Sequence, residues 1–314
     1  MNLCLTLPKG HLNHFEVKQP ILFAEAPMLR DVPEYAWLFN EYRGAVIVDN
    51  SPFQVGVYSG YGDPTLSFQE LLGIVKTHDL RHPIVVLPDV LNDSQATLIQ
   101  AKASIRVLED LFPPLTAPRT CFVVQGKNYD DWFDCLLQAQ AQFQPDMIGI
   151  PYSIEFRSPS SLLSREMREI FRSLRLRSNT NAWTWAMNRA ELVLCLQQHY
   201  LMGSDVPDKV HLFGLGHPVE LTFYTGDRAS IVYSLDTTLP FVAAAEGLCF
   251  DDGVLERFYG VETNKPIWTG DHILSEDKQY SDEIVALFLR NRAAMYRALL
   301  EGAYHSIVSK GGVL

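Results

Sequence analysis

The chain has 314 residues, of which 47% are hydrophobic and 20% are charged, and its formal net charge is −11. This apolar content suffices for a large core and argues against a disordered chain. The acidic excess disfavours a general nucleic-acid coat, because phosphate binding depends on Lys and Arg, although a local basic patch is compatible with it. The five cysteines form no C-x-x-C pair and no apolar run reaches 18 residues. We therefore expect a cytoplasmic protein with reduced thiols and no membrane span.

Short apolar runs alternate with helical patterns along the chain. The predicted strands are 21–25, 45–48, 84–87, 121–124, 146–149, 211–213 and 231–235. The predicted helices are 30–44, 67–79, 94–112, 128–143, two within 157–203, of which the second is 182–202, and 282–302. This alternation indicates βα units and a parallel sheet.

An eighth strand, predicted at 257–261, would complete a (β/α)8 TIM barrel, whereas fewer strands would suit a doubly wound sheet. Neither G-x-G-x-x-G nor G-x-x-x-x-G-K-[ST] is present, which disfavours a nucleotide-binding sheet. We therefore predict one α/β TIM-barrel domain over 1–314 with a short N-terminal extension. A helical insertion at 157–210 and a C-terminal helical part at 250–314 complete it.

A polar residue or a glycine follows nearly every predicted strand. These residues are Asp49, Asp89, Gln125, Gly126, Gly149, Gly214, Gly216 and Asp236. Each alone is explained by a turn, but recurrence over six strands favours one site, because the carboxyl ends of barrel strands share a face. Two carboxylates at one site are what cleavage of a glycosidic bond requires. A third carboxylate and an amide could bind the donor edge of a nucleobase.

Six segments, in order, resemble the tRNA-guanine transglycosylase superfamily, whose members are TIM barrels that exchange guanine in a polynucleotide for a 7-deazaguanine base. The segments are 49–54 (family D-S-G-G-[FY]-Q), 85–89 (a strand ending in Asp), 123–126 (I-V-Q-G), 149–155 (G-G-L-x-x-G-E), 211–216 (Y-L-M-G-V-G) and 233–240 (D-x-F-D-x-x-x-P). The resemblance implies a barrel fold and base-exchange chemistry for this chain.

The resemblance also implies roles for individual residues. Asp236 corresponds to the nucleophile that forms a covalent glycosyl-enzyme, and Asp49 corresponds to the general acid/base. The positions that correspond to base-binding residues are Asp89, Gln125, Gly126, Gly149, Ile150, Phe53, Phe213, Gly214 and Glu155. Phe53 and Phe213 would sandwich the base, while the polar members would contact its edge.

Departures from the tRNA enzymes point to DNA as the polynucleotide. Only Cys249 follows Asp236, so the zinc-binding C-x-C-x-x-C…H pattern of those enzymes is missing and no metal is expected. No appended RNA-binding domain fits in the remaining residues. Ser51 and Pro52 replace two hallmark glycines, and Ile150 replaces a third. This short form is most similar to the phage and bacterial DNA-guanine transglycosylases.

We therefore expect a pentosyltransferase that exchanges guanine in DNA for a free 7-deazaguanine base such as preQ0, in the cytoplasm of a cell or of a phage's host. Transfer to tRNA, hydrolysis of a nucleoside or glycoside, and non-catalytic binding of a deazaguanine or nucleic acid stay open as alternatives. The sequence leaves open whether accessory DNA-modification proteins bind the chain and whether it forms a homodimer.

Phosphate contacts are predicted for Arg172, Arg175 and Arg177. The segment 157–189 holds seven arginines and two acidic residues, and such a concentration is what phosphate contacts need. A solvated helix face is the alternative. His211, at the start of its strand, is interpreted as structural.

Overall fold

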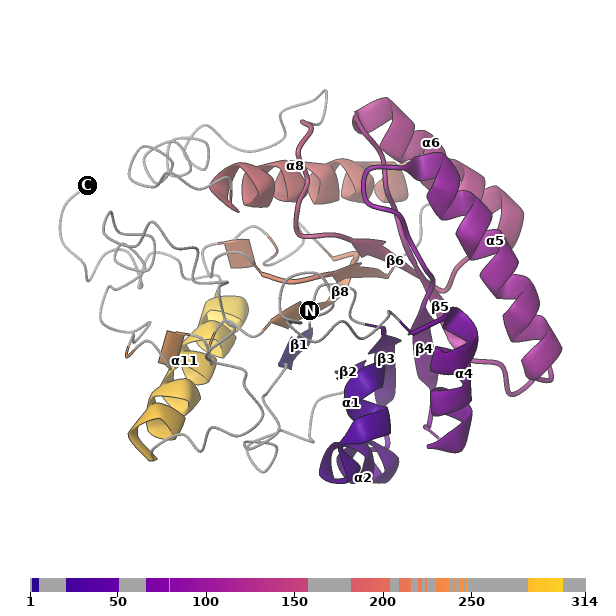
Figure 1. Ribbon diagram of the computed structural model, residues 1–314. Helices are drawn as coiled ribbons and strands as arrows, with labels where there is room; N and C mark the ends of the chain where they lie inside the picture. Colours follow the sequence, from indigo (N-terminus) through magenta and orange to yellow (C-terminus); the bar gives the residue numbers. More distant parts are fainter. Residues whose placement is uncertain are drawn as a thin grey trace.

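The computed structural model describes most of the barrel. The described residues are 2–5, 21–50, 66–78, 80–157, 182–203, 209–215, 220–221, 224, 230–237, 240, 243–244, 247 and 282–301. Within them, eight parallel strands form a nearly closed barrel with helices outside it (Figure 1). The predicted α/β barrel is therefore confirmed.

The strands lie around the barrel in the order β1-β8-β7-β6-β5-β4-β3-β2, and every neighbouring pair is parallel. They are β1 (Asn2–Leu5), β2 (Ile21–Glu25), β3 (Ala45–Asp49), β4 (Pro83–Val86), β5 (Arg119–Val123), β6 (Met147–Ile150), β7 (Val210–Leu212) and β8 (Val232–Thr237). The first and last strands of this order approach each other, since Cys4 Sγ lies 3.7 Å from the Ile21 carbonyl oxygen.

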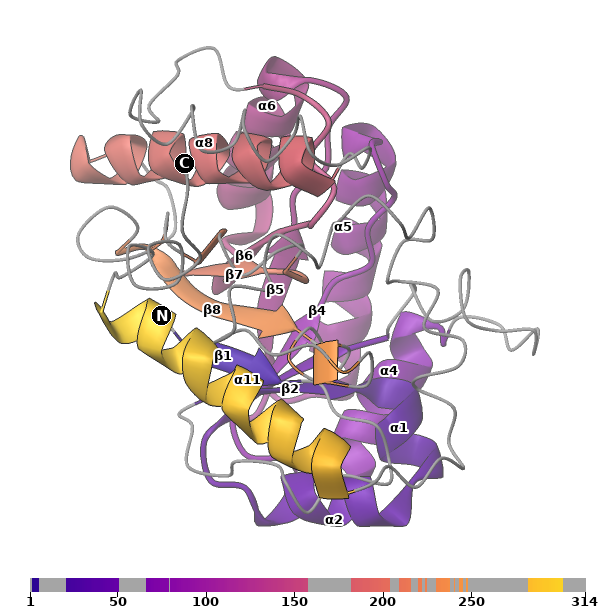
Figure 2. The same cartoon turned by 90° about the vertical axis from the view of Figure 1, so that its left-hand side faces the viewer.

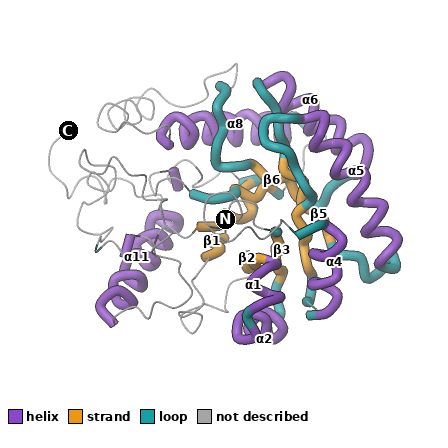
Figure 3. Tube along the Cα trace, in the orientation of Figure 1, coloured by secondary structure: helices purple, strands orange, loops and turns teal. Residues whose placement is uncertain are grey.

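The described helices surround the strands (Figure 3). They are α1 (Ala26–Asp31), α2 (Pro33–Glu41), α4 (Phe68–Thr77), α5 (Ser94–Leu111), α6 (Tyr129–Phe143), α8 (Ala182–Leu201) and α11 (Asp282–Glu301). Helices α4, α5 and α6 cover the side of β4 to β6, and α11 lies on the flank of β1 and β8 (Figures 1 and 2). None of the described helices is both long and apolar enough to cross a membrane.

Local sequence sets where several helices begin. Ser67 and Glu70 form a reciprocal capping box at the start of α4. The side chains of Asp93 and Asn128 accept backbone N–H groups at the starts of α5 and α6. The predicted elements that lie within the described residues agree with the structure to within two residues, except at two places.

Those two exceptions have simple causes. The eighth strand is β1, so the predicted N-terminal extension supplies a barrel strand, whereas 257–261 lies outside the described residues. A run of only four residues carries too little pattern to be recognised as a strand. The predicted helix 30–44 is two helices separated at Val32, which adopts φ −120° and ψ 97°. Pro33 follows Val32, and a residue before proline is driven out of the helical region.

Strand side chains alternate between the barrel interior and the helix layer. The interior members form one apolar cluster: Cys4, Ile21, Phe23, Ala45, Ile47, Ile84, Val86, Cys121, Val123 and Met147. The alternate residues of these strands, such as Leu22, Val46 and Phe122, pack in the larger cluster that includes helix residues. Because side chains repeat every two residues, the interior phase continues into Glu25 and Asp49 at the carboxyl ends of β2 and β3.

Candidate active site

Four carboxylates from different strands lie at the carboxyl end of the barrel. Glu25 ends β2 and Asp49 ends β3, and the two are partners in the register of that parallel pair. Asp236 lies near the end of β8 and is the register partner of Cys4 in β1. Asp89 follows β4 by three residues. This is the face at which the polar residues after the strands predict a site.

Asp49 lies in surroundings that favour a protonated carboxyl group. It is half-buried and ends a strand whose other residues are buried. Its pKa is raised from 3.8 to about 8, chiefly by burial and then by the negative charges of Asp89 and Asp236. Glu25 adds to this rise, while a backbone hydrogen bond at Asn50 opposes it. Asp49 therefore holds its proton at neutral pH and can donate it.

Asp89 and Gln125 form a hydrogen-bonded pair. Gln125 Nε2 donates to Asp89 Oδ2 at 2.5 Å, and Gln125 Oε1 accepts from the backbone N–H of Asn92 at 3.1 Å. Burial raises the pKa of Asp89 to about 6, and the hydrogen bond from Gln125 limits the rise. The buried Gln125 thus orients Asp89, and its contacts within the described residues use its oxygen and one amide hydrogen.

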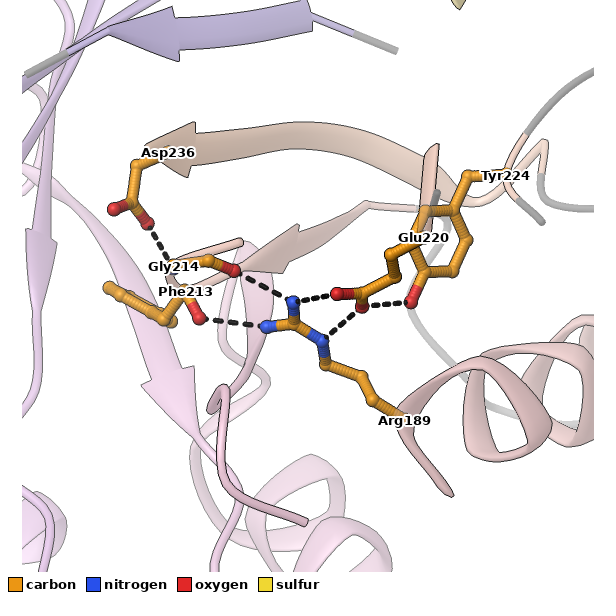
Figure 4. A network of polar contacts seen from close by, with 6 residues as sticks. All are labelled: Arg189, Phe213, Gly214, Glu220, Tyr224 and Asp236. Atoms are coloured by element: carbon orange, nitrogen blue, oxygen red, sulfur yellow. Dashed lines mark hydrogen bonds and ion pairs between the residues drawn. The ribbon is translucent and has the colours of Figure 1, made fainter. Parts of the chain in front are cut away.

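Asp236 is held by groups of β7 and the loop after it. Its Oδ1 accepts from the backbone N–H of Gly214 at 2.9 Å and lies 3.2 Å from His211 Nε2. Gly214 has φ +66°, a conformation that favours glycine, so the residue type supports the turn that makes this contact. Figure 4 shows the Gly214 N–H beside the carboxylate, whose side chain is 15% exposed. These two contacts on one oxygen hold the Asp236 carboxylate in a defined orientation.

Arg189 of α8 binds the backbone of the loop after β7 (Figure 4). Arg189 donates to the backbone oxygens of Phe213 and Gly214 at 2.8 and 2.7 Å. It also contacts both carboxylate oxygens of Glu220, at 2.6 and 2.9 Å, and Glu220 accepts from the Tyr224 hydroxyl at 2.7 Å. Burial is the largest single influence on the pKa of Arg189 and lowers it, but the charge and hydrogen bond of Glu220, together with Tyr224 and Tyr152, outweigh burial and raise the pKa. The charged guanidinium therefore gives this loop a defined path.

Phe213 lies directly over Gly149 of β6. A Cβ atom added to Gly149 would stand 2.5 Å from Phe213 Cε2, so only glycine lets the ring approach this closely. The ring also packs edge-on against His211, with centroids 4.5 Å apart. The structure thus brings together two of the predicted base-binding residues, Gly149 and Phe213. The Phe213 ring is partly exposed and packs on the imidazole that contacts Asp236.

The other described base-binding candidates lie in different surroundings. A Cβ on Gly126 would meet the Trp132 backbone nitrogen at 2.5 Å, so Gly126 allows α6 to pack closely. The Ile150 side chain belongs to the outer cluster, and its carbonyl accepts from the Phe213 N–H at 3.0 Å. Glu155 is exposed after β6.

Several predicted residues lie outside the described residues. They are Phe53 and Arg172, Arg175 and Arg177, together with Ser51, Pro52 and Gly216. Of the arginines counted in the basic segment, Arg189 is fully buried in its pair with Glu220, so it is unsuited to phosphate contact.

Two components of this region were not predicted from the sequence. Glu25 carries the same signal as Asp49, a carboxylate at the end of an apolar run, and this signal could have found it. Arg189 and Glu220 are separated by 31 residues in the chain and share no motif, so their pairing has no local signal.

Comparison with known proteins does not assign the chain to a family. No family model matches it, and no curated protein matches it. Within the part of the chain that the structure describes, no group of three or more His, Cys, Asp or Glu side chains is arranged to hold a metal ion. Support for a function therefore comes from the geometry of the carboxylates and the motifs around them.

Proposed function

We propose that the protein is a guanine transglycosylase that replaces guanine in DNA with a free 7-deazaguanine base through a covalent aspartyl-glycosyl intermediate. One observation carries the proposal: Asp49, with a pKa of about 8, shares the carboxyl end of the barrel with Asp236, whose Oδ1 accepts an N–H group. A protonated carboxyl beside a carboxylate is the pair that retaining glycosyl transfer requires.

The first half-reaction uses Asp49 as an acid. An oxygen of Asp236 attacks C1′ of the target nucleotide, and the C1′–N9 bond breaks with its electron pair passing to guanine. Asp49 donates its proton to the departing base and becomes a carboxylate. The burial and the neighbouring negative charges that raise its pKa make the resulting carboxylate a better base than an ordinary aspartate.

The second half-reaction reverses these roles. A free 7-deazaguanine takes the place of guanine, and the ionised Asp49 removes the proton from its N9. N9 then attacks C1′, the bond from C1′ to Asp236 breaks, and both aspartates return to their starting states. A pKa of about 8 suits a group that must act first as an acid and then as a base near neutral pH.

The Asp89 carboxylate is suited to bind the edge that guanine and 7-deazaguanine share. Guanine and 7-deazaguanine each present the N1–H and 2-amino donors, and a carboxylate accepts both. Gln125 holds Asp89 in place, and the pKa of about 6 leaves Asp89 mostly ionised at pH 7. The ring of Phe213 provides a stacking surface nearby. Recognition of the shared edge would explain why one site accepts the leaving and the incoming base.

The choice of DNA rests on the resemblance to the short, zinc-free members of the superfamily, and tRNA is the alternative substrate. A target base inside a duplex must leave the stack to reach carboxylates at the end of a barrel. Single-stranded DNA should therefore be a better substrate than duplex DNA in the absence of other proteins.

The test is base exchange with radiolabelled guanine on DNA and on tRNA. We expect label to enter DNA with the wild-type protein and not with Asp236→Ala. Omission of the free base should trap a covalent DNA–protein adduct on a denaturing gel, and Asp236→Ala should form none. Label in tRNA alone would refute the DNA substrate, and release of guanine without incorporation would identify a hydrolase. Undiminished exchange by Asp236→Ala would refute the assignment of the nucleophile.

A further inference from the structure

His211 lies buried between two polar side chains of β8. Its Nδ1 is 2.8 Å from Ser234 Oγ, and its Nε2 is 3.2 Å from Asp236 Oδ1. The imidazole stacks on Phe23, with ring centroids 6.0 Å apart and an interplanar angle of 6°. The Phe213 ring makes an edge contact with it, with centroids 4.5 Å apart and an interplanar angle of 85°. With both nitrogens and both aromatic contacts engaged, the ring has one orientation. A purely structural histidine, as the sequence predicted for His211, would not need this set of contacts.

A register shift between β7 and β8 creates this contact. Val210 pairs with Val232, but the next residue, His211, pairs with Ser234, so Tyr233 is passed over. Such an extra residue re-aims the side chains that follow it. The shift places Ser234 beside the imidazole. Asp236, two residues further on, then lies on the same face of β8 as Ser234.

We propose that His211 is a positioning residue that fixes Oδ1 of Asp236 and so makes Oδ2 the oxygen that attacks C1′; this inference rests on the proposed function. Both side-chain contacts of Asp236 within the described residues, from His211 Nε2 and from the Gly214 N–H, involve Oδ1. Two donors on one oxygen prevent rotation of the carboxylate and draw negative charge to that oxygen. Oδ2 keeps its lone pairs for the sugar carbon.

The partners of the imidazole define where its proton lies. An ionised Asp236 can only accept, so His211 Nε2 must carry the hydrogen in this contact. Nδ1 faces a hydroxyl group, which can donate to it, and the partner of one ring nitrogen sets the protonation of the other. Ser234 therefore helps to keep the donor on the nitrogen that faces the nucleophile.

Two amide variants separate the role of Nε2 from that of Nδ1. In His211→Gln the side-chain NH2 reaches about as far as Nε2, whereas in His211→Asn it reaches only as far as Nδ1. We expect His211→Asn to slow formation of the covalent adduct about 100-fold, since misplaced reacting groups lose rate on this scale. His211→Gln should lose no more than about tenfold, and the KM for the free base should change less than about threefold in both. Urea unfolding of both variants measures any general loss of stability.

A second readout does not depend on activity. In protein labelled with ¹⁵N-histidine, the signal assigned by its loss in His211→Gln should show a proton on Nε2. Asp236→Asn should shift the Nε2 resonance, and Ser234→Ala should shift the Nδ1 resonance. An Nε2 without a proton would overturn the inference.

The kinetic outcomes distinguish this inference from the proposed function. Adduct formation by His211→Asn at the wild-type rate, or equal losses in the Asn and Gln variants, would overturn the inference alone. A wild-type protein that forms no adduct and exchanges no base would overturn the proposed function, and with it the role of His211 in attack. A large loss in the Asn variant with rescue in the Gln variant would support both.

Discussion

Replacing Asp49 with Asn should stabilise the protein while it lowers base exchange by at least about 100-fold. The folded state holds the Asp49 proton up to a pKa of about 8, whereas the unfolded chain releases it near the ordinary value of 3.8. Between these values the unfolded state binds fewer protons, so the free energy of unfolding of the wild type falls as the pH rises. Asn has nearly the shape of the protonated carboxyl and cannot ionise, so the variant escapes this loss.

The size of the effect follows from the distance between pH 7 and the ordinary pKa. Each pH unit in this window favours unfolding of the wild type by about 1.4 kcal/mol, because one proton is released. Since pH 7 is about three units above 3.8 and lies below 8, we expect Asp49→Asn to be more stable than the wild type by about 4 kcal/mol at pH 7. The advantage should nearly vanish at pH 4 and stop growing above pH 8.

Urea unfolding of both proteins at several values between pH 4 and pH 8 measures this difference. Asp134→Asn, which removes an exposed carboxylate on α6, controls for the loss of one charge. A difference between Asp49→Asn and the wild type that stays constant across this range would refute the raised pKa. Base exchange should fall by at least about 100-fold in the same variant, because the acid and base are removed together.

Two further variants test the packing around the site. Gly149→Ala should displace the Phe213 ring, cost about 1–3 kcal/mol in the free energy of unfolding and raise the KM for the free base. The matched change Gly73→Ala in α4, where a Cβ meets nothing within 4 Å, should stabilise by about 0.5–1 kcal/mol, and equal effects of the two would contradict the packing argument. Arg189→Met should cost about 3–5 kcal/mol because it leaves Glu220 charged and buried. Adding Glu220→Leu should recover much of this loss, and a double variant as unstable as the single one would contradict the explanation.

Much of the fold was predictable because its signals are local. The alternation of apolar runs with helical patterns, the capping box at Ser67 and the cap at Asp93 depend on residues within a few positions of each other. Strand β1 escaped prediction because four residues carry little pattern. Its place in the barrel comes from pairing with β8, more than 200 residues away in the chain.

The candidate site was predictable in part for the same reason. Asp49 and Asp89 each follow an apolar strand, and any parallel barrel brings such strand ends to one face. Glu25 ends its strand in the same way, but α1 begins at the next residue, Ala26. No turn residues therefore follow Glu25 in the sequence to indicate the end of a strand. Residues of one site that come from a loop and a distant helix, as Gly214 and Arg189 do, share no such signal.

Which residue types end the barrel strands follows from the chain alone, because alternation and capping act between close neighbours. How those residues behave depends on the tertiary structure. The pKa of Asp49 depends first on its burial and then on charges carried by three other strands or their ends, and both follow position in space. The register shift that brings His211 to Asp236 is set by packing between β7 and β8. A shift of one residue moves every later side chain to the other face, and no pattern within either strand encodes it.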